Sequence, residues 1–217
     1  MKGDSQLRQD VMEELNWDPA VDATDIGVEV KDGVVTLSGH LTNFAEKYAA
    51  EAAVRRIPGV QGLAVELDVR LPADAVRADA DIARAVRNVL DWNSLLPGDR
   101  IQVTVEHGAV TLAGTVDWNY QRLAAEHAVA HLFGVTGVSN GLVVRPQAEG
   151  TDLKERIRDA IVRQAEADAS QVRVKVKEGA VTLEGHVLTW AEREAAFNAA
   201  WSAPGVSSVA NNIKVTR

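Results

Sequence analysis

The feature that most constrains this chain is a ten-residue pattern that occurs three times. It reads KDGVVTLSGH from Lys31, EHGAVTLAGT from Glu106 and KEGAVTLEGH from Lys177. The corresponding glycines lie 75 and then 71 residues apart. That spacing is too long for a solenoid, whose repeats have roughly 20 to 50 residues. We therefore interpret the chain as three small domains, residues 1–72, 73–147 and 148–217.

In each copy the pattern predicts a β-hairpin. Apolar residues alternate before the turn, as at Ile26, Val28 and Val30, and after it, as at Val35 and Leu37. This alternation puts one face of the sheet on the core. The turn requires positive φ, which glycine adopts at no steric cost. The glycines that we predict to hold turns and element ends are Gly33, Gly39, Gly59, Gly108, Gly114, Gly134, Gly179, Gly185 and Gly205.

An amphipathic helix precedes each hairpin. Residues 5–17 carry Leu7, Val11 and Leu15 on one stripe, a spacing that predicts a helix with one buried face. The same stripe recurs as Ile82, Val86 and Leu90, and as Leu153, Ile157 and Ile161. The candidate N-caps are Asp4 or Ser5 in the first copy, and Thr151 or Asp152 in the third.

A second helix follows each hairpin. Asn43 and Thr189 each stand three residues before a glutamate, which is the spacing of a capping box. Small residues recur four apart and predict a helix stripe close to the sheet, at Ala49 and Ala53, Ala124 and Ala128, and Ala195 and Ala199. A last strand then closes each unit. The order α-β-β-α-β, three times over, predicts an α+β protein in which each unit is a three-stranded sheet with two helices on one face.

Each unit resembles a BON domain. The motif G-V/A-V-T-L-x-G is followed in the second helix by Lys47, Arg122 or Arg193, and then by Gly-Val near the end of the unit. The resemblance covers nearly the whole chain and extends to osmotically induced bacterial stress proteins. It implies a role in stress protection and binding to a phospholipid surface or an envelope partner. Some relatives also carry a LysM module, one of them a potassium-binding protein, but no LysM-like segment follows here.

Charge is unevenly distributed along the chain. The formal net charge is −8, and the three predicted domains hold 7 basic and 13 acidic, 6 and 8, and 10 and 10 residues. This balance opposes non-specific binding of nucleic acid, which needs a net basic face. The sequence begins without an apolar signal region and has no apolar run long enough to span a bilayer. We expect a cytoplasmic protein, or a periplasmic one if a signal peptide has been removed.

No catalytic motif is present. The sequence lacks a phosphate-binding P-loop, a nucleophile elbow and an H-E-x-x-H motif, and it has no cysteine. His127 and His131 have the i, i+4 spacing of metal ligands but no third ligand accompanies them, so we interpret them as a solvated helix face. We therefore expect no enzyme activity, no metal and no cofactor.

Two sets of residues in the third copy are candidate binding sites for lipid or a partner. Arg173, Lys175 and Lys177 alternate with valines and should project from the outer face of the sheet, where they are able to hold phosphate headgroups. The alternative is a solvated face. Trp190, Phe197 and Trp201 share one helix stripe, which either docks onto another repeat of the same chain or contacts a partner or membrane.

Two further aromatic residues stand at equivalent helix ends. We expect Trp17 and Trp92 to cover the small cores, since aromatic side chains at helix ends usually do so.

The sequence thus predicts a non-enzymatic binding module in bacterial osmotic or envelope stress, with anionic phospholipid or an envelope protein as its partner. One alternative is a structural or chaperone-like interaction protein that does not bind lipid. Another, suggested by the LysM-containing relatives alone, is binding of potassium.

Overall fold

The computed structural model describes residues 3–145, 153–165 and 172–216, and within them the α-β-β-α-β order occurs three times. The first unit consists of α1 (Asp4–Trp17), β1 (Ile26–Lys31), β2 (Val34–Leu41), α2 (Phe44–Arg55) and β3 (Gly62–Val69). The second consists of α3 (Asp79–Trp92), β4 (Ile101–Glu106), β5 (Ala109–Val116), α4 (Asn119–Ala130) and β6 (Gly137–Val144). The third consists of α5 (Leu153–Ala165), β7 (Val172–Lys177), β8 (Ala180–Val187), α6 (Trp190–Trp201) and β9 (Ser208–Val215). The predicted fold class is confirmed.

In each sheet the strands lie side by side in the order in which they occur along the chain. In the first unit β1 pairs antiparallel with β2, and β2 pairs parallel with β3 across the helix α2. The hairpin turn consists of two residues, Asp32 and Gly33, with φ of 50° and 77°. Two positive φ values in a two-residue loop define the turn that matches the twist of paired strands. The other two units repeat this topology and this turn.

Each unit has its own hydrophobic core between the two helices and one sheet face. In the first unit the predicted stripe of Leu7, Val11 and Leu15 is buried against Val35 and Leu37 of β2. The equivalent stripes of α3 and α5 are buried in the same way. Because both helices cover one face, the outer face of each sheet is left to solvent.

The predicted stripe of the second helix is confirmed at Ala53 and Ala199, whereas Ala49 and Ala195 are not among the buried residues. In α2 the buried residues are Glu46, Ala50, Ala53 and Val54, whereas Ala49 is only half-buried. In α6 they are Ala196, Ala199 and Ala200 in place of Ala195. The small residues do let the helix approach the sheet.

The basic residue of the BON motif in the second helix bonds that helix to the last strand in two of the three units. The Lys47 ammonium donates to the Leu67 carbonyl oxygen at 2.7 Å, and Arg193 Nε donates to the Ile213 carbonyl oxygen at 3.1 Å. Arg122 differs, because its Nε donates to Asn119 Oδ1 within its own helix. The predicted caps at Asn43 and Thr189 are present, each accepting from the backbone N–H three residues on.

The predicted N-cap at Asp4 or Ser5 is wrong. Gly3 occupies the cap position, and Asp4 is the first helical residue. Its carboxylate accepts from the backbone N–H groups of Asp32 and Gly33, at 2.9 and 3.1 Å. The carboxylate therefore joins the start of α1 to the hairpin turn. The caps predicted at Thr151 and Asp152 lie outside the described residues.

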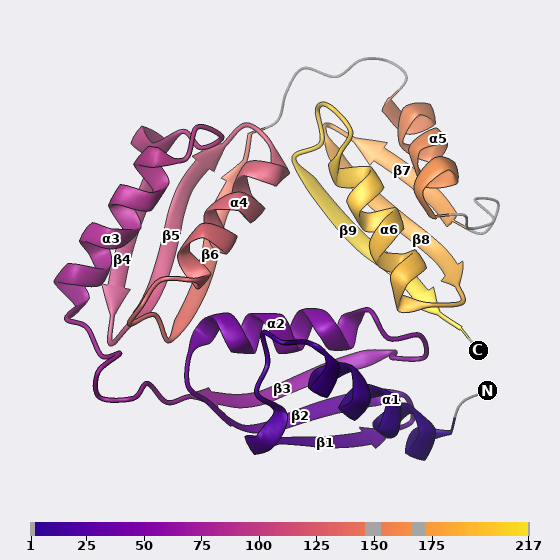
Figure 1. Cartoon of the computed structure of the whole chain (residues 1–217). Helices are drawn as coiled ribbons and strands as arrows, with labels where there is room; N and C mark the ends of the chain where they lie inside the picture. Colours follow the sequence, from indigo (N-terminus) through magenta and orange to yellow (C-terminus); the bar gives the residue numbers. More distant parts are fainter. Residues whose placement is uncertain (1–2, 146–152, 166–171, 217) are drawn as a thin grey trace.

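The three units lie at the corners of a triangle, with the second helices α2, α4 and α6 toward its inner side (Figure 1). Phe44, at the start of α2, packs against the core of the second unit. Tyr48 of α2 meets His127 of α4 edge to face, with ring centroids 6.2 Å apart. These contacts join the first two units through their second helices.

Candidate functional site

The outer face of the third sheet carries the predicted basic stripe. Arg173, Lys175 and Lys177 on β7 are all exposed, and they alternate with valines that face the core. The strand register places Lys214 of β9 beside His186 of β8 on the same outer face. Lysine and arginine side chains therefore lie on both edge strands of this sheet, β7 and β9.

One carboxylate partly balances this basic face. Glu184 on β8 accepts from the Lys175 ammonium at 2.8 Å and lies 3.8 Å from the Arg173 guanidinium. The hydrogen bond from Lys175 lowers the pKa of Glu184 below its ordinary value. Among the residues that the structure describes, Lys177 has no such partner. The face therefore keeps a net positive charge.

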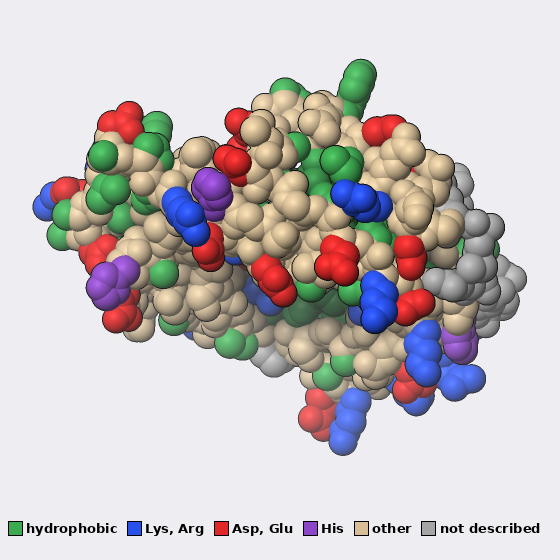
Figure 2. Space-filling model, turned by 90° about the horizontal axis from the view of Figure 1, so that it is seen from below, with side chains coloured by type: hydrophobic (Ala, Val, Ile, Leu, Met, Phe, Trp, Pro, Cys, Tyr) green, Lys and Arg blue, Asp and Glu red, His purple; other side chains and the backbone are tan. Residues whose placement is uncertain are grey.

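The other two sheets do not repeat this stripe. The positions equivalent to Arg173, Lys175 and Lys177 hold Gly27, Glu29 and Lys31 in the first unit, and Gln102, Thr104 and Glu106 in the second. Acidic and basic side chains are interspersed over most of the molecular face seen from below (Figure 2). A row of three cations on the first strand is thus a local property of the third unit.

The predicted aromatic stripe of α6 is largely an internal contact. Trp201 packs against the core of its own unit and against the core of the second unit. The guanidinium of Arg122, on α4, lies 5.3 Å from the centroid of its ring. Phe197 meets Trp201 edge to face at 6.2 Å. Of the two alternatives from the sequence, docking onto another repeat describes the position of Trp201.

Trp190 also lies against its own unit. The guanidinium of Arg193 lies 5.0 Å from its ring centroid, and the side chain is half-buried. The indole N–H groups of Trp190 and Trp201 are buried, and neither has a hydrogen-bond partner among the described residues. The structure thus brings Phe197 and Trp201 together but separates all three aromatic residues from the basic sheet face, which lies on the other side of the sheet.

The prediction that Trp17 and Trp92 cover the cores is wrong. Their exposed fractions are 84% and 91%. Both are the last residues of their helices, and the chain turns away immediately after them. Their exposure could have been predicted from their position in the helix. Each follows the last buried leucine by two residues, which places it about 200° around the helix from the core-facing stripe. Figure 2 shows single hydrophobic side chains that stand clear of the surface.

His127 and His131 are neighbours on α4, with ring centroids 4.5 Å apart. His127 faces Tyr48 of α2, so it takes part in the contact between units rather than lying on a purely solvated face. Burial, followed by the charge of Glu126, raises the pKa of Tyr48. No group of three or more metal-ligating side chains occurs within residues 3–145, 153–165 and 172–216. In the same part of the chain, no helix has the length and apolarity needed to cross a membrane.

Family comparison agrees with the three-unit fold. The model of the BON domain matches residues 3–70, 78–146 and 150–217, so the chain belongs to the BON domain family. It is similar to osmotically-inducible protein Y of Escherichia coli strain K12, at 29% identity over 126 residues. That match covers 56% of this chain and 63% of the length of the relative.

Solved structures add a weaker similarity. A structure of CdsD, a structural protein of the type III secretion system of Chlamydia trachomatis, is 14% identical with a TM-score of 0.27. It covers 96% of this chain and 91% of its own. The C-terminal domain of CdsD gives the same identity and TM-score, with both chains fully covered. At this score no shared architecture follows.

Proposed function

We propose that this chain is a non-enzymatic binding module of the bacterial osmotic or envelope stress response that contacts anionic phospholipid through its third unit. The observation that carries the proposal is the exposed row of Arg173, Lys175 and Lys177 on β7. Side chains two residues apart on one strand face are about 6.6 Å apart. Three cations in such a row can each contact a different headgroup on a flat surface.

The energies involved are sufficient for reversible binding. Each Lys or Arg near an anionic membrane contributes about 1 kcal/mol. Lys214 extends the same face, while Glu184 reduces its charge. Because the first unit is acidic, repulsion turns it away from the membrane, and the third unit is the one that approaches.

The stress role is supported by the similarity to osmotically-inducible protein Y, together with the family match over all three units. We infer action by binding rather than by catalysis because the sequence has no catalytic motif. Contact with a lipid surface is consistent with either side of an inner membrane, so both the cytoplasm and the periplasm remain compatible with the proposal.

The proposal is tested by co-sedimentation with vesicles. The full chain should sediment with phosphatidylglycerol vesicles at low salt, and it should be released as salt shortens the Debye length from about 30 Å at 0.01 M to about 3 Å at 1 M. It should not sediment with neutral phosphatidylcholine vesicles. Equal recovery with both lipids, or no recovery with either, would contradict an electrostatic lipid contact.

A second candidate function is chaperone-like interaction with proteins, without lipid. The exposed indoles of Trp17 and Trp92 favour it, because tryptophan is enriched at protein–protein interfaces. The measurement is suppression of aggregation of a heat-unfolded test protein. Under this alternative a Trp17→Ser, Trp92→Ser variant loses that suppression, whereas charge reversal on β7 leaves it unchanged.

A further inference from the structure

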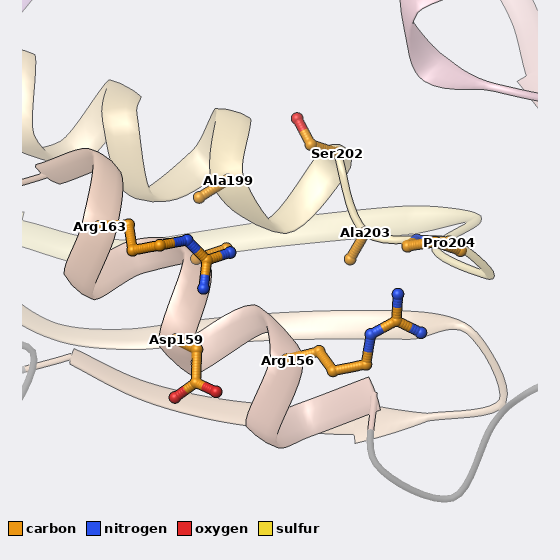
Figure 3. Close-up of a pocket in the computed structure, with 8 residues that line it drawn as sticks. Arg156, Asp159, Arg163, Ala199, Ser202, Ala203 and Pro204 are labelled. Carbon is orange, nitrogen blue, oxygen red and sulfur yellow. The ribbon is translucent and has the colours of Figure 1, made fainter.

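A hollow of about 390 Å³ lies between α5 and the end of α6, on the helix side of the third unit (Figure 3). Pockets of about 300 to 1,000 Å³ are the size range that small ligands use. Two arginines of α5 stand at its rim, and the loop after α6 forms the opposite wall. The lining residues are Arg156, Asp159, Ala160, Arg163, Ala199, Ser202, Ala203 and Pro204.

The two arginines direct their charge into this hollow. Arg156 and Arg163 are seven residues apart, two helical turns, and so lie on one face of α5. Figure 3 shows both guanidinium groups directed toward the space beside the end of α6, while the Asp159 carboxylate points away from them. Neither arginine forms a hydrogen bond or ion pair with any other described residue. Two cations thus line the cavity, and neither forms an ion pair with the Asp159 carboxylate, which also lines it.

The equivalent place in the first unit contains its own counterions. There Arg56, the C-cap residue of α2, lies 3.3 Å from both Glu14 and Asp18 at the end of α1. The third unit has Ser202 at the C-cap position of α6 and Ala160 at the position of Glu14. In the first unit the cation is thus on the second helix, whereas in the third unit the cations are on the first helix. The third unit has no carboxylate at the position of Glu14.

The second unit has no cations at the equivalent positions of its first helix. A hollow on α3 is lined by Ala85, Asn88, Val89 and Trp92 alone, without residues of α4 or the loop after it. By helix register these positions correspond to Arg156, Asp159, Ala160 and Arg163. The equivalent positions of α3 thus hold no cation, and the two arginines at these positions distinguish the third unit from the second.

We propose that this hollow binds a phosphate group, held between Arg156 and Arg163 with the small Ser202 leaving room for it. Guanidinium groups donate paired hydrogen bonds to phosphate oxygens. The arginines approach from positions about 10 Å apart along the helix. A phosphate is tetrahedral, so its oxygens can accept from both guanidinium groups at once. A carboxylate has two oxygens in one plane, and a single guanidinium can bond both of them.

A competing role for the arginines is to complement the negative end of the α6 dipole. The last carbonyls of α6 already have donors: Asn198 O accepts from both Ser202 N and Ser202 Oγ, and Ala200 O accepts from Ala203 N. A dipole role predicts that removing the arginines lowers stability without any ligand. A binding role predicts loss of phosphate binding in a protein that remains folded.

This site is independent of the proposed lipid contact, since it lies across the sheet from Arg173, Lys175 and Lys177. The phosphate group has two sources, a free phosphate ester or anion and a lipid headgroup. Vesicles and inorganic phosphate used side by side distinguish these sources.

The test is titration of the full chain with inorganic phosphate at constant ionic strength, followed by NMR of the arginine Nε–H signals. We expect saturable shifts of the Arg156 and Arg163 signals. Arg156→Gln and Arg163→Gln should each weaken binding about tenfold or more, because each removes a charge-assisted pair of hydrogen bonds. Arg158→Gln, which makes the same charge change on another face of α5, should leave binding unchanged. An absence of saturable shifts, or equal loss in the Arg158 variant, would overturn the proposal.

A Ser202→Glu variant provides a second test that keeps both arginines. The new carboxylate stands at the position equivalent to Arg56 and should form ion pairs with Arg156 and Arg163. In the first unit the pairing is reversed, since Arg56 on the second helix pairs with Glu14 on the first. We expect phosphate binding to be lost, and undiminished binding would count against the site. Reduced sedimentation of this variant with phosphatidylglycerol vesicles identifies the ligand as a headgroup, whereas unchanged sedimentation identifies it as a free phosphate. Charge reversal on β7 should leave phosphate binding intact whichever source applies.

Discussion

At the residue scale, a glycine within the second strand of each sheet has a conformation that other residues rarely adopt. Gly39, Gly114 and Gly185 have φ of 125°, 126° and 132°. A Cβ at Gly114 would collide with the backbone oxygen of Arg100, just before β4. The strand continues two residues past each of these glycines, so none of them ends it.

Gly114→Ala should therefore lower the free energy of unfolding by about 2 kcal/mol or more, since strained φ alone costs about 1 to 3 kcal/mol. Gly137→Ala is the matched control in the same sheet, because nothing lies within 4 Å of a Cβ there. Chemical denaturation of both variants gives the comparison. Equal stabilities would show that this backbone approach is looser than described.

A carboxylate at the start of α3 repeats the contact that Asp4 makes in the first unit. Asp79 accepts from the backbone N–H groups of His107 and Gly108, both at 2.9 Å. These bonds, chiefly the one from Gly108, lower the pKa of Asp79 below its ordinary value of 3.8. A carboxyl whose pKa is lower in the folded state stabilises the fold above its unfolded pKa, and that contribution is lost as pH falls through the folded pKa.

Asp79→Asn should accordingly destabilise the protein at neutral pH, and the difference from wild type should shrink toward zero in acid. The measurement is unfolding free energy across this pH range. Asp74→Asn, in the linker, removes an equal charge and should change little. A deficit in Asp79→Asn that stays constant down to the lowest pH would exclude ionisation of Asp79 as its cause.

At the element scale, α4 contacts the second helices of both other units. Its Arg122 lies over Trp201 of α6, and its His127 meets Tyr48 of α2. Lys47 and Arg193 bond their helix to the last strand of their own sheet. Arg122, at the equivalent position, instead contacts Trp201 of another unit.

A double-mutant cycle between Arg122→Ala and Trp201→Ala should give a coupling energy of about 0.5 to 2 kcal/mol, the range for a cation over an aromatic face. Arg84, on the exposed side of α3, is the control, and its coupling to Trp201 should be within error of zero. If Arg122 shows equally little coupling, α6 does not dock on α4 in solution.

These elements show what the sequence was able to predict. Hairpins and first helices follow from local periodicity, so Val35, Leu37 and the stripe of Leu7 were predictable from a few neighbouring residues. The contact of Trp201 with the second unit was not, because it depends on how two units pack together. The exposure of Trp17 and Trp92 depends on where the chain turns after the helix. The hollow beside Arg156 depends on residues from two helices and a loop, whose distances no sequence pattern gives.

At the scale of the whole molecule, three similar units meet through their second helices and leave their outer sheet faces free (Figure 1). The basic face belongs to the third unit and the exposed tryptophans belong to the first two. Repetition of one fold has thus produced surfaces of different chemistry on a single chain.

We predict that residues 148–217 fold alone but weakly. A unit of about 70 residues buries only about 60% of its unfolded surface, and separation also exposes Trp201 to solvent. Thermal unfolding followed by circular dichroism should show a cooperative transition below that of the full chain. If the fragment has no cooperative transition, the three units form one interlocked core and the proposed domain boundaries have no independent meaning.

The most direct test of the account compares two triple charge reversals in the full chain. Arg173→Glu, Lys175→Glu, Lys177→Glu changes the outer face of the third sheet, and Lys31→Glu, Lys154→Glu, Arg158→Glu makes the same change in charge elsewhere. Binding to phosphatidylglycerol vesicles is measured for both. At about 1 kcal/mol for each cation, we predict that the first variant binds at least about a hundredfold more weakly than wild type, while the second keeps most of its affinity. Equal losses in the two variants, or unchanged binding in the first, would contradict the assignment of the lipid contact to this face.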